Sequence, residues 1–191
     1  MKFPSIYLAS TSPRRRELLA QIGVEFSLIS IDVDESRFAN ELAQDYVKRV
    51  ALAKAQAGWN SLENADKRPV LGSDTSVVLA GDVLGKPHND ADARDMLQRL
   101  SGERHQVMTA VAIVTAEKTW IELNTSTVTF APLSQQDIDW YISTKEGVDK
   151  AGGYAVQGLA ALFIEQIEGS YSGIMGLPIR ETGLLLTQVA G

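Results

Sequence analysis

Hydrophobic residues along the first third of the chain alternate between short apolar runs and a helical spacing. The apolar runs predict buried strands, and apolar positions three and four residues apart predict amphipathic helices. We expect Gly23 and Gly58 to end the two helices and Asn40 to cap the second one. The pattern predicts strands at 6–9 and 26–31, helices at 13–22 and 41–57, and inward side chains at Leu18, Leu19, Ile22, Leu42, Tyr46, Val50 and Ala53.

The rest of the chain combines the same patterns with longer β-rich runs. Ser134 and Asp137 have the spacing of a capping box at a helix start, and Pro178 begins a terminal helix that carries the leucines at 184–186. The predicted elements are a strand at 69–73 followed by a hairpin that turns at 80–82, helices at 90–100 and from 135 to about 145, long strands at 105–115 and 119–130, and a strand at 160–167.

The order of these elements indicates the fold class. Helices connect some of the predicted strands, and tight turns connect others. Such a mixture is typical of an α/β (mixed α+β) fold, and we expect two lobes around a cleft. The sequence contains no internal repeat, low-complexity segment or obvious linker, so we expect a single domain over residues 1–191.

Composition narrows the class of protein further. With 191 residues, 45% of them hydrophobic, the chain can bury a full core. Its net charge of −6 argues against electrostatic binding of nucleic acid over a broad surface but is compatible with a local anion pocket. Without cysteine, and with His88 and His105 as its only histidines, a metal site would use carboxylates and favour Mg²⁺ or Mn²⁺. Pro4 and Ser5 interrupt the N-terminal apolar run, which is too short for a signal peptide or membrane span, so we expect a cytoplasmic protein with no membrane partner.

Three arginines stand at a predicted helix start, where positive charge is unfavourable. In the stretch STSPRRR, Ser12 takes the cap position and Pro13 the first helical position. A helix N-terminus is already positive, so Arg14 and Arg15 indicate a bound anion such as phosphate, held also by backbone N–H groups. The helical rotation favours Arg14 and Arg15 over Arg16 for one shared pocket. The alternative is that all three arginines are solvated.

Asp74, in the stretch GSDTS, ends an otherwise apolar predicted strand. A carboxylate there is costly unless it is paired, hydrated or bound to metal, and strand ends often hold active sites in α/β sheets. The alternative is an Asx turn that starts the hairpin. Asp34 and Glu35 follow the strand at 26–31 and could supply a second oxygen ligand, with a plain acidic loop as the alternative.

Three lysines could complete an anion site. Lys54 lies on an apolar helix face near Val50, Lys86 follows the hairpin in GKP, and Lys150 precedes AGGYAVQG. Taken singly, each is also explained as a surface lysine. The glycines of the last stretch allow close backbone approach, although turns explain them equally well. The sequence has no Walker loop and no GxGxxG motif.

The ordered motifs of the chain resemble those of the Maf family of nucleoside triphosphate pyrophosphatases, and more closely its dTTP/UTP-specific branch. These motifs are ASTSPRRRELL at 9–19, GSDT at 72–75, GKP at 85–87, DKAGGYAVQG at 149–158 and GLP at 176–178. The resemblance extends from residue 6 to about 186. It departs at Ser73, where alanine is often expected, and before Lys86, where some relatives carry glutamate; neither change removes a charged group.

The resemblance implies a Maf/inosine-triphosphatase-like fold, with a central mixed sheet flanked by helices, in a cytoplasmic enzyme that is often a homodimer. It implies hydrolysis of a nucleoside triphosphate between the α- and β-phosphates, giving monophosphate and pyrophosphate, with a divalent metal cation. Asp74 matches the proton acceptor and Glu35 an acidic position near the metal; whether Asp74 acts as base or metal ligand stays open. Ser10, Arg14, Arg15, Lys54 and Lys86 match the phosphate site, and Arg14, Thr75 and Gln157 match positions tied to substrate choice.

The Gln157 amide suits a pyrimidine reader because it offers both a donor and an acceptor. These match the O4 and N3–H edge of thymine or uracil, whereas cytosine presents the opposite pattern. Discrimination would need a fixed amide, and Thr75 is a candidate neighbour to hold it. The alternative is that Gln157 only caps a strand beside Gly158.

Two other functions fit parts of the sequence. A non-catalytic, nucleotide-binding regulator of septum formation would need the arginines but not Asp74. A nucleic-acid binder using the cluster at 14–16 is disfavoured by the acidic balance of the chain. We therefore expect a nucleoside triphosphate as the partner and no nucleic acid.

Overall fold

The structure is a computed structural model that describes residues 3–63 and 67–190. In this part of the chain, seven strands form one mixed sheet in the order β2-β1-β3-β5-β6-β7, with β4 paired to β3. Strand β1 is parallel to β2 and β3, and the other pairs are antiparallel. The strands are β1 (Ile6–Leu8), β2 (Phe26–Leu28), β3 (Val70–Leu79), β4 (Asp82–Leu84), β5 (Arg104–Val114), β6 (Thr119–Phe130) and β7 (Ile164–Glu168). The predicted mixed α/β class is confirmed.

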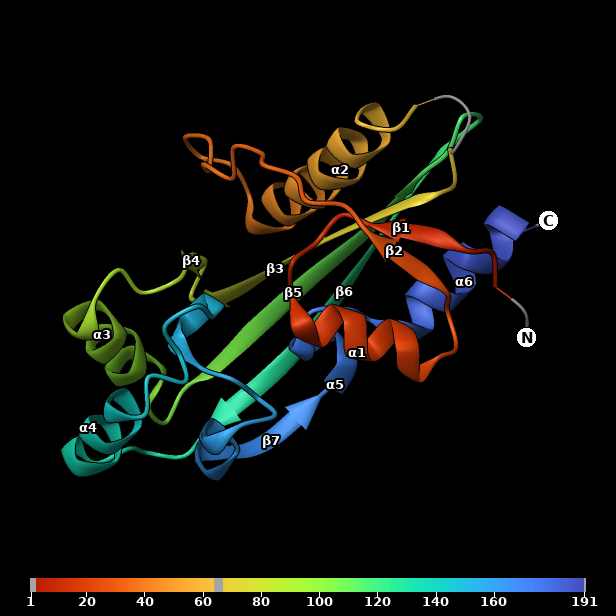
Figure 1. Cartoon of the computed structure of the whole chain (residues 1–191). Helices are drawn as coiled ribbons and strands as arrows, with labels where there is room; N and C mark the ends of the chain where they lie inside the picture. Colours follow the sequence, from red (N-terminus) through yellow and green to blue (C-terminus); the bar gives the residue numbers. More distant parts are fainter. Residues whose placement is uncertain (1–2, 64–66, 191) are drawn as a thin grey trace.

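The helices gather at the two ends of the long strands. Figure 1 shows β3, β5 and β6 running through the molecule, with α3 and α4 beside one end and α1, α2 and α6 beside the other. Separate clusters of buried side chains occupy the two ends. The helices are α1 (Pro13–Gln21), α2 (Ala43–Asn60), α3 (Asp90–Leu100), α4 (Gln135–Ser143), α5 (Tyr171–Met175) and α6 (Ile179–Ala190), with 3-10 helices η2 (Ala151–Gly153) and η3 (Leu159–Phe163).

Helix α2 lies directly on the sheet, and this contact positions part of the site. A Cβ on Gly72 of β3 would lie 2.4 Å from the carbonyl oxygen of Ala51, so glycine is required for the approach. Lys54 belongs to the buried face of α2, next to Val50 and Ala55. Its side chain therefore points at the strand two residues beyond Gly72.

The predicted boundaries of this helix are wrong at both ends. Asn40 adopts a left-handed φ of 59° and precedes the helix, whose N-cap is Leu42. Leu42, predicted to face inward, is exposed, so that prediction is wrong. Gly58 does not end α2: it is buried inside it, where a Cβ would lie 2.9 Å from Cγ1 of Val70. This glycine serves helix–sheet contact rather than termination.

Two predicted strands are longer than the real ones. The strand expected at 26–31 ends at Leu28. The strand expected at 160–167 begins only at Ile164, because residues 159–163 form η3. Ala160 and Phe163 are buried three residues apart, which is the 3-10 repeat.

Other local predictions are confirmed. The hairpin between β3 and β4 turns through Ala80 and Gly81, both with positive φ. The capping box of α4 forms with both of its hydrogen bonds between Ser134 and Asp137. Short-range turn and cap signals are thus sufficient to predict the local structure where few long-range contacts compete with them.

His105 makes stability depend on pH. It is fully buried among aromatic rings, with Nε2 2.8 Å from the hydroxyl of Tyr154. Burial lowers the pKa of His105 to about 4, and the nearby backbone of Glu103 opposes this shift in part. As the pH falls, His105 is therefore protonated in the unfolded chain at a higher pH than in the folded protein.

Above about pH 6.5, the pKa of His105 in the unfolded chain, this residue should not lower the free energy of unfolding. As the pH approaches 4, the free energy of unfolding should fall by up to about 3 kcal/mol. Denaturant titrations between pH 7 and 4 measure this fall. The variant His105→Gln, which cannot titrate, should show a shallower slope; parallel slopes for the two proteins would contradict the assignment.

Candidate active site

A cleft of about 1,200 Å³ opens between the two ends of the molecule. It is lined by the start of α1, one face of α2, the middle of β3, the segment after β4, residues 149–157 and the end of α5. All nine site residues expected from the sequence line this one cleft: Ser10, Arg14, Arg15, Glu35, Lys54, Asp74, Thr75, Lys86 and Gln157.

The centre of the cleft is a lysine held by two carboxylates. Lys54 Nζ lies 2.8 Å from Oδ1 of Asp74 and 2.8 Å from Oε1 of Glu35. The lysine and Asp74 are buried, whereas the Glu35 side chain is about half exposed. Three segments that are distant in sequence therefore converge on one ammonium group.

Asp74 lies inside a strand, not at a turn. Strand β3 continues to Leu79, and Asp74 pairs across the sheet with Ala110, so both the predicted strand end and the Asx-turn alternative are wrong. Burial raises the pKa of Asp74, Glu35 adds to that rise, and the charges of Lys54 and Arg15 oppose it. The result is a carboxylate with increased affinity for a proton, a property suited to a general base.

Glu35 reaches the cleft from the exposed loop after β2. Burial would raise its pKa, but the hydrogen bond from Lys54 and the charges of Lys54, Lys86 and Arg15 hold the pKa below its ordinary value. Asp34 does not line the cleft; its Oδ1 accepts a hydrogen bond from the backbone of Ser36 at 2.8 Å. Of the two acidic residues, only Glu35 is placed to act with Asp74.

Arg15 is fixed in the wall of the cleft by three segments. Its Nε donates to the carbonyl of Gly176 at 2.9 Å, and its other nitrogens contact the hydroxyls of Ser10 at 3.1 Å and Thr75 at 3.5 Å. Burial lowers the pKa of Arg15, while Asp74 and Glu35 raise it. The guanidinium is thus preorganised beside the two carboxylates.

Arg14, Lys86 and Lys150 are the other cationic residues of the cleft. Arg14 forms no ion pair or hydrogen bond with another residue in the described ranges, and Lys86 is exposed on the opposite wall. Lys150 contacts its neighbour Asp149. Arg16 does not line the cleft, as the helical rotation predicted. The cations and the N-terminus of α1 together form a positively charged region that suits phosphate groups.

Gln157 lies at the exposed tip of a turn closed by a 3.0 Å hydrogen bond from Gly158 N to Ala155 O. No strand begins beside it, so the strand-capping alternative is wrong. The expected contact with Thr75 is also absent from the described residues: the Thr75 hydroxyl pairs with Thr109 at 2.9 Å and with Arg15. Gln157 lines the cleft, and its amide has no side-chain partner in the described chain.

Sequence reasoning missed three supporting groups. Tyr46, expected in the core, lines the cleft and donates its hydroxyl to the backbone oxygen of Glu35 at 2.9 Å. Thr109 is buried, and its hydroxyl links the hydroxyl of Thr75 to the carbonyl of Gly173 through two hydrogen bonds. Gly176 has a φ of 115°, and its carbonyl receives both Arg15 and the buried hydroxyl of Ser73. The sequence features that could have indicated these groups were a threonine in an apolar strand and the GLP motif.

The residues present fit a divalent metal bound together with a substrate. Within residues 3–63 and 67–190, no group of three or more histidine, aspartate or glutamate side chains is placed to hold a metal ion by itself. Glu35 and Asp74 nevertheless converge on the Lys54 ammonium, and Mg²⁺ is commonly held by one or two carboxylates, several waters and substrate phosphates. This donor set suits Mg²⁺ or Mn²⁺ better than zinc.

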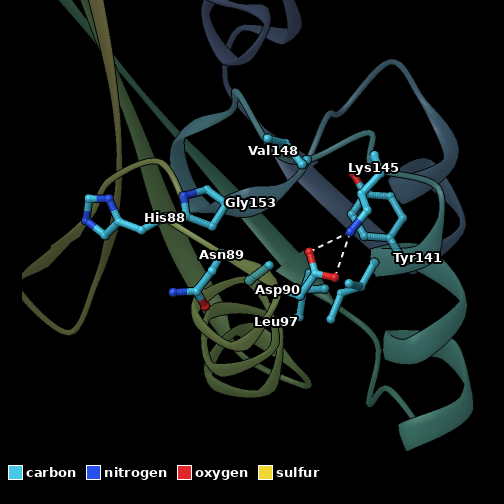
Figure 2. Close-up of a pocket in the computed structure, with 12 residues that line it drawn as sticks. His88, Asn89, Asp90, Leu97, Tyr141, Lys145, Val148 and Gly153 are labelled. Atoms are coloured by element: carbon cyan, nitrogen blue, oxygen red, sulfur yellow. Dashed lines mark hydrogen bonds and ion pairs between the residues drawn. The ribbon is translucent and has the colours of Figure 1, made fainter.

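A second, smaller cavity of about 310 Å³ lies beside the cleft, between α3, α4 and residues 147–153 (Figure 2). Its lining is mainly apolar, and Lys145 reaches Asp90 across it with Nζ–O distances of 2.7 and 2.6 Å. None of the nine expected site residues lines it. The candidate chemistry therefore belongs to the larger cleft.

The mixed sheet and its cationic cleft with a buried carboxylate define an anion-binding protein of the α/β class. The chain belongs to the Maf family, because the family model described as Maf-like protein matches residues 5–189. The solved structure of the Staphylococcus aureus Ham1 protein matches with a TM-score of 0.54 at 16% identity, covering 98% of each chain, and so has the same fold. Within the described residues, no helix is long and apolar enough to cross a membrane.

Curated relatives match nearly the whole chain. The dTTP/UTP pyrophosphatase of Shewanella sp. (strain MR-7) is 49% identical over 189 residues, covering 96% of this chain and 97% of the relative. That of Pseudoalteromonas atlantica is 50% identical over 186 residues, covering 97% of each. That of Methylobacillus flagellatus is 52% identical over 181 residues, covering 95% of this chain and 90% of the relative.

Proposed function

We propose that the protein hydrolyses dTTP and UTP to the nucleoside monophosphate and pyrophosphate. The observation that carries this proposal is the buried Asp74, bound to Lys54 and flanked by Arg15, inside a cleft large enough for a nucleotide. Relatives about half identical over nearly the full length carry the name of this activity. The triphosphate supplies the negative charge that the arginines at the helix start require.

Each group of the cleft has a role in this reaction. Asp74 orients a water molecule and takes a proton from it as the water oxygen attacks the α-phosphorus. The bond from the α-phosphorus to the bridging oxygen breaks, and pyrophosphate leaves with that oxygen. Arg14, Arg15 and Lys86 neutralise the charge that develops on the leaving group. Lys54 keeps Asp74 ionised before the attack.

Glu35 and Asp74 would hold a Mg²⁺ or Mn²⁺ ion jointly with phosphate oxygens. When bound, such an ion neutralises phosphate charge and polarises the reacting phosphoryl group. Lys54, which lies between the two carboxylates, keeps them together until substrate arrives.

A nucleotide-binding regulator without turnover is the second candidate. It would need the cations but not a buried carboxylate beside them, and burying Asp74 is costly for a protein that only binds an anion. The position of Asp74 favours the enzyme. The regulator remains an outcome of the activity assay.

The assay incubates the pure protein with dTTP, UTP, CTP, GTP and ATP in the presence of Mg²⁺ or Mn²⁺ and identifies the products. Monophosphate and pyrophosphate from dTTP and UTP are expected, and excess EDTA should abolish turnover. Orthophosphate as the first product would reject the reaction, full turnover in EDTA would reject the metal, and binding without turnover would favour the regulator.

Base selectivity should depend on the Gln157 amide. The variant Gln157→Glu keeps the acceptor but loses the donor, so the preference for dTTP over CTP should fall at least tenfold, the scale for an unpaired polar group in a reading site. The ratio of kcat/KM for the two substrates measures it. An unchanged ranking of dTTP, UTP, CTP and GTP would remove Gln157 from the recognition site.

The resemblance also implies a cytoplasmic homodimer, and we include both in the proposal. The cytoplasm supplies nucleoside triphosphates, and a chain without cysteine is compatible with its reducing conditions. Sedimentation velocity should give a species of twice the 20.8 kDa chain mass. A monomer at all concentrations would contradict the dimer.

A further inference from the structure

The position of the Gln157 amide depends on the backbone turn that carries it. The side chain is exposed at the tip of residues 155–158 and has no side-chain partner in the described chain. A glutamine amide that is free to rotate can exchange its donor and acceptor and then matches either pyrimidine edge. Holding the turn does not stop this rotation, but it sets the distance from the amide to the base, on which any reading of the base depends.

Two side chains outside the cleft hold both ends of this turn. The hydroxyl of Tyr141 accepts a hydrogen bond from Ala155 N at 3.2 Å. The carboxylate of Glu146 accepts from Leu159 N at 2.9 Å and from Ala160 N at 3.4 Å. Tyr141 in turn donates to Oε1 of Glu146 at 2.9 Å, so the two residues form one unit. Hydrogen bonds to a carboxylate are stronger than neutral ones.

The Tyr141–Glu146 pair is held in place by contacts with the hydrophobic core and with α3. Tyr141 of α4 is buried, and its ring centroid lies 5.4 Å from that of Phe163. Lys145, just before Glu146, has a φ of 59° and is paired with Asp90 of α3, as Figure 2 shows. Neither Tyr141 nor Glu146 lines the cleft. The turn is therefore their hydrogen-bonded link to the cleft.

Gly158 lies in close contact with the Glu146 carboxylate. A Cβ at this position would lie 2.3 to 2.4 Å from the carboxylate atoms of Glu146. The backbone of Gly158, with φ −111°, is open to any residue. A larger residue here would have to displace the Glu146 carboxylate from the turn.

We propose that Glu146, together with Tyr141, is a positioning residue for base selection: it holds the 155–160 turn so that the Gln157 amide lies within reach of the pyrimidine edge. This inference rests on the proposed function. Glu146→Gln keeps the size of the side chain but replaces one acceptor oxygen with a donor, so it repels one of the backbone N–H groups. The preference for dTTP over CTP should fall about tenfold, the scale of one lost hydrogen bond to a charged group.

The effect should appear in KM for dTTP and leave kcat within about twofold, since Asp74 and the cations keep their places. Gly158→Ala, which forces the carboxylate away from the turn, should reproduce the loss of preference. Asp137→Asn is the matched control: it removes the charge from the capping box of the helix that carries Tyr141 without touching the turn and should keep the wild-type preference. Melting temperatures of all variants separate selectivity from stability.

A double-mutant cycle with Gln157→Ala gives the most direct test. If Glu146 acts through Gln157, adding Glu146→Gln to Gln157→Ala should change the dTTP/CTP preference by less than twofold. A full tenfold change in that background, an unchanged preference in Glu146→Gln alone, or an equal loss in Asp137→Asn would overturn the proposal. The ratio of dTTP and CTP dissociation constants from calorimetry gives the same comparison without turnover. Failure of the proposed reaction and failure of the positioning role are thus separate results.

Discussion

Replacing Asp74 with asparagine should lower kcat for dTTP at least a hundredfold, a typical scale for the loss of a general base. Asparagine is nearly isosteric and still accepts the hydrogen bond from Lys54, which spans 2.8 Å in the native protein. The amide cannot take up a proton from water. Nucleotide binding should persist, and it should tighten where the carboxylate repels phosphate.

The pH profile provides a second readout for Asp74. Because burial raises the pKa of this carboxyl, the acidic limb of kcat/KM should lie above the ordinary aspartate value of about 4. The limb should disappear in Asp74→Asn. Asp34→Asn, a change outside the cleft, is the control and should retain wild-type turnover. Near-normal turnover by folded Asp74→Asn would contradict the catalytic assignment.

Replacing Lys54 with methionine should cost about 3–5 kcal/mol in the free energy of unfolding, because it leaves the buried Asp74 carboxylate without its counter-charge. Turnover should fall strongly as well, since loss of the Lys54 charge raises the pKa of Asp74 further and leaves less of the carboxylate ionised to act as a base. Chemical denaturation at pH 7 measures the first effect and steady-state kinetics the second.

The pH dependence of this loss has a definite sign. Without Lys54, the pKa of Asp74 rises further, and a carboxyl whose folded pKa is raised destabilises the protein as the pH rises through that value. The stability deficit of Lys54→Met should therefore shrink as the pH falls toward 4. Lys86→Met removes an exposed lysine from the same cleft and should change stability by no more than about 0.5 kcal/mol. Equal stability losses in the two variants would contradict the buried pair.

Features decided by local spacing could be predicted from the sequence. The rotation of α1 separates Arg14 and Arg15 from Arg16, and the apolar repeat of α2 places Lys54 on the buried face. Turn and cap signals likewise located the β3–β4 hairpin and the start of α4. In each case the residues that decide the outcome lie within a few positions of one another.

Features decided by distant contacts could not be predicted. Arg15 is oriented by a carbonyl 161 residues away, and Thr75 pairs with Thr109 on the neighbouring strand instead of Gln157. The short apolar run at 159–163 fits a strand or a 3-10 helix equally well by itself. Glu146 looks like an ordinary surface acid until its backbone partners at 159 and 160 are known.

The central claim, that water activated by Asp74 attacks the α-phosphorus while pyrophosphate leaves toward the cations, is tested most directly by hydrolysis of dTTP in ¹⁸O-labelled water. Mass spectrometry of the products locates the oxygen that entered. We predict one ¹⁸O atom in the thymidine monophosphate and none in the pyrophosphate. Label in the pyrophosphate would mean attack on the β-phosphorus and would contradict the account.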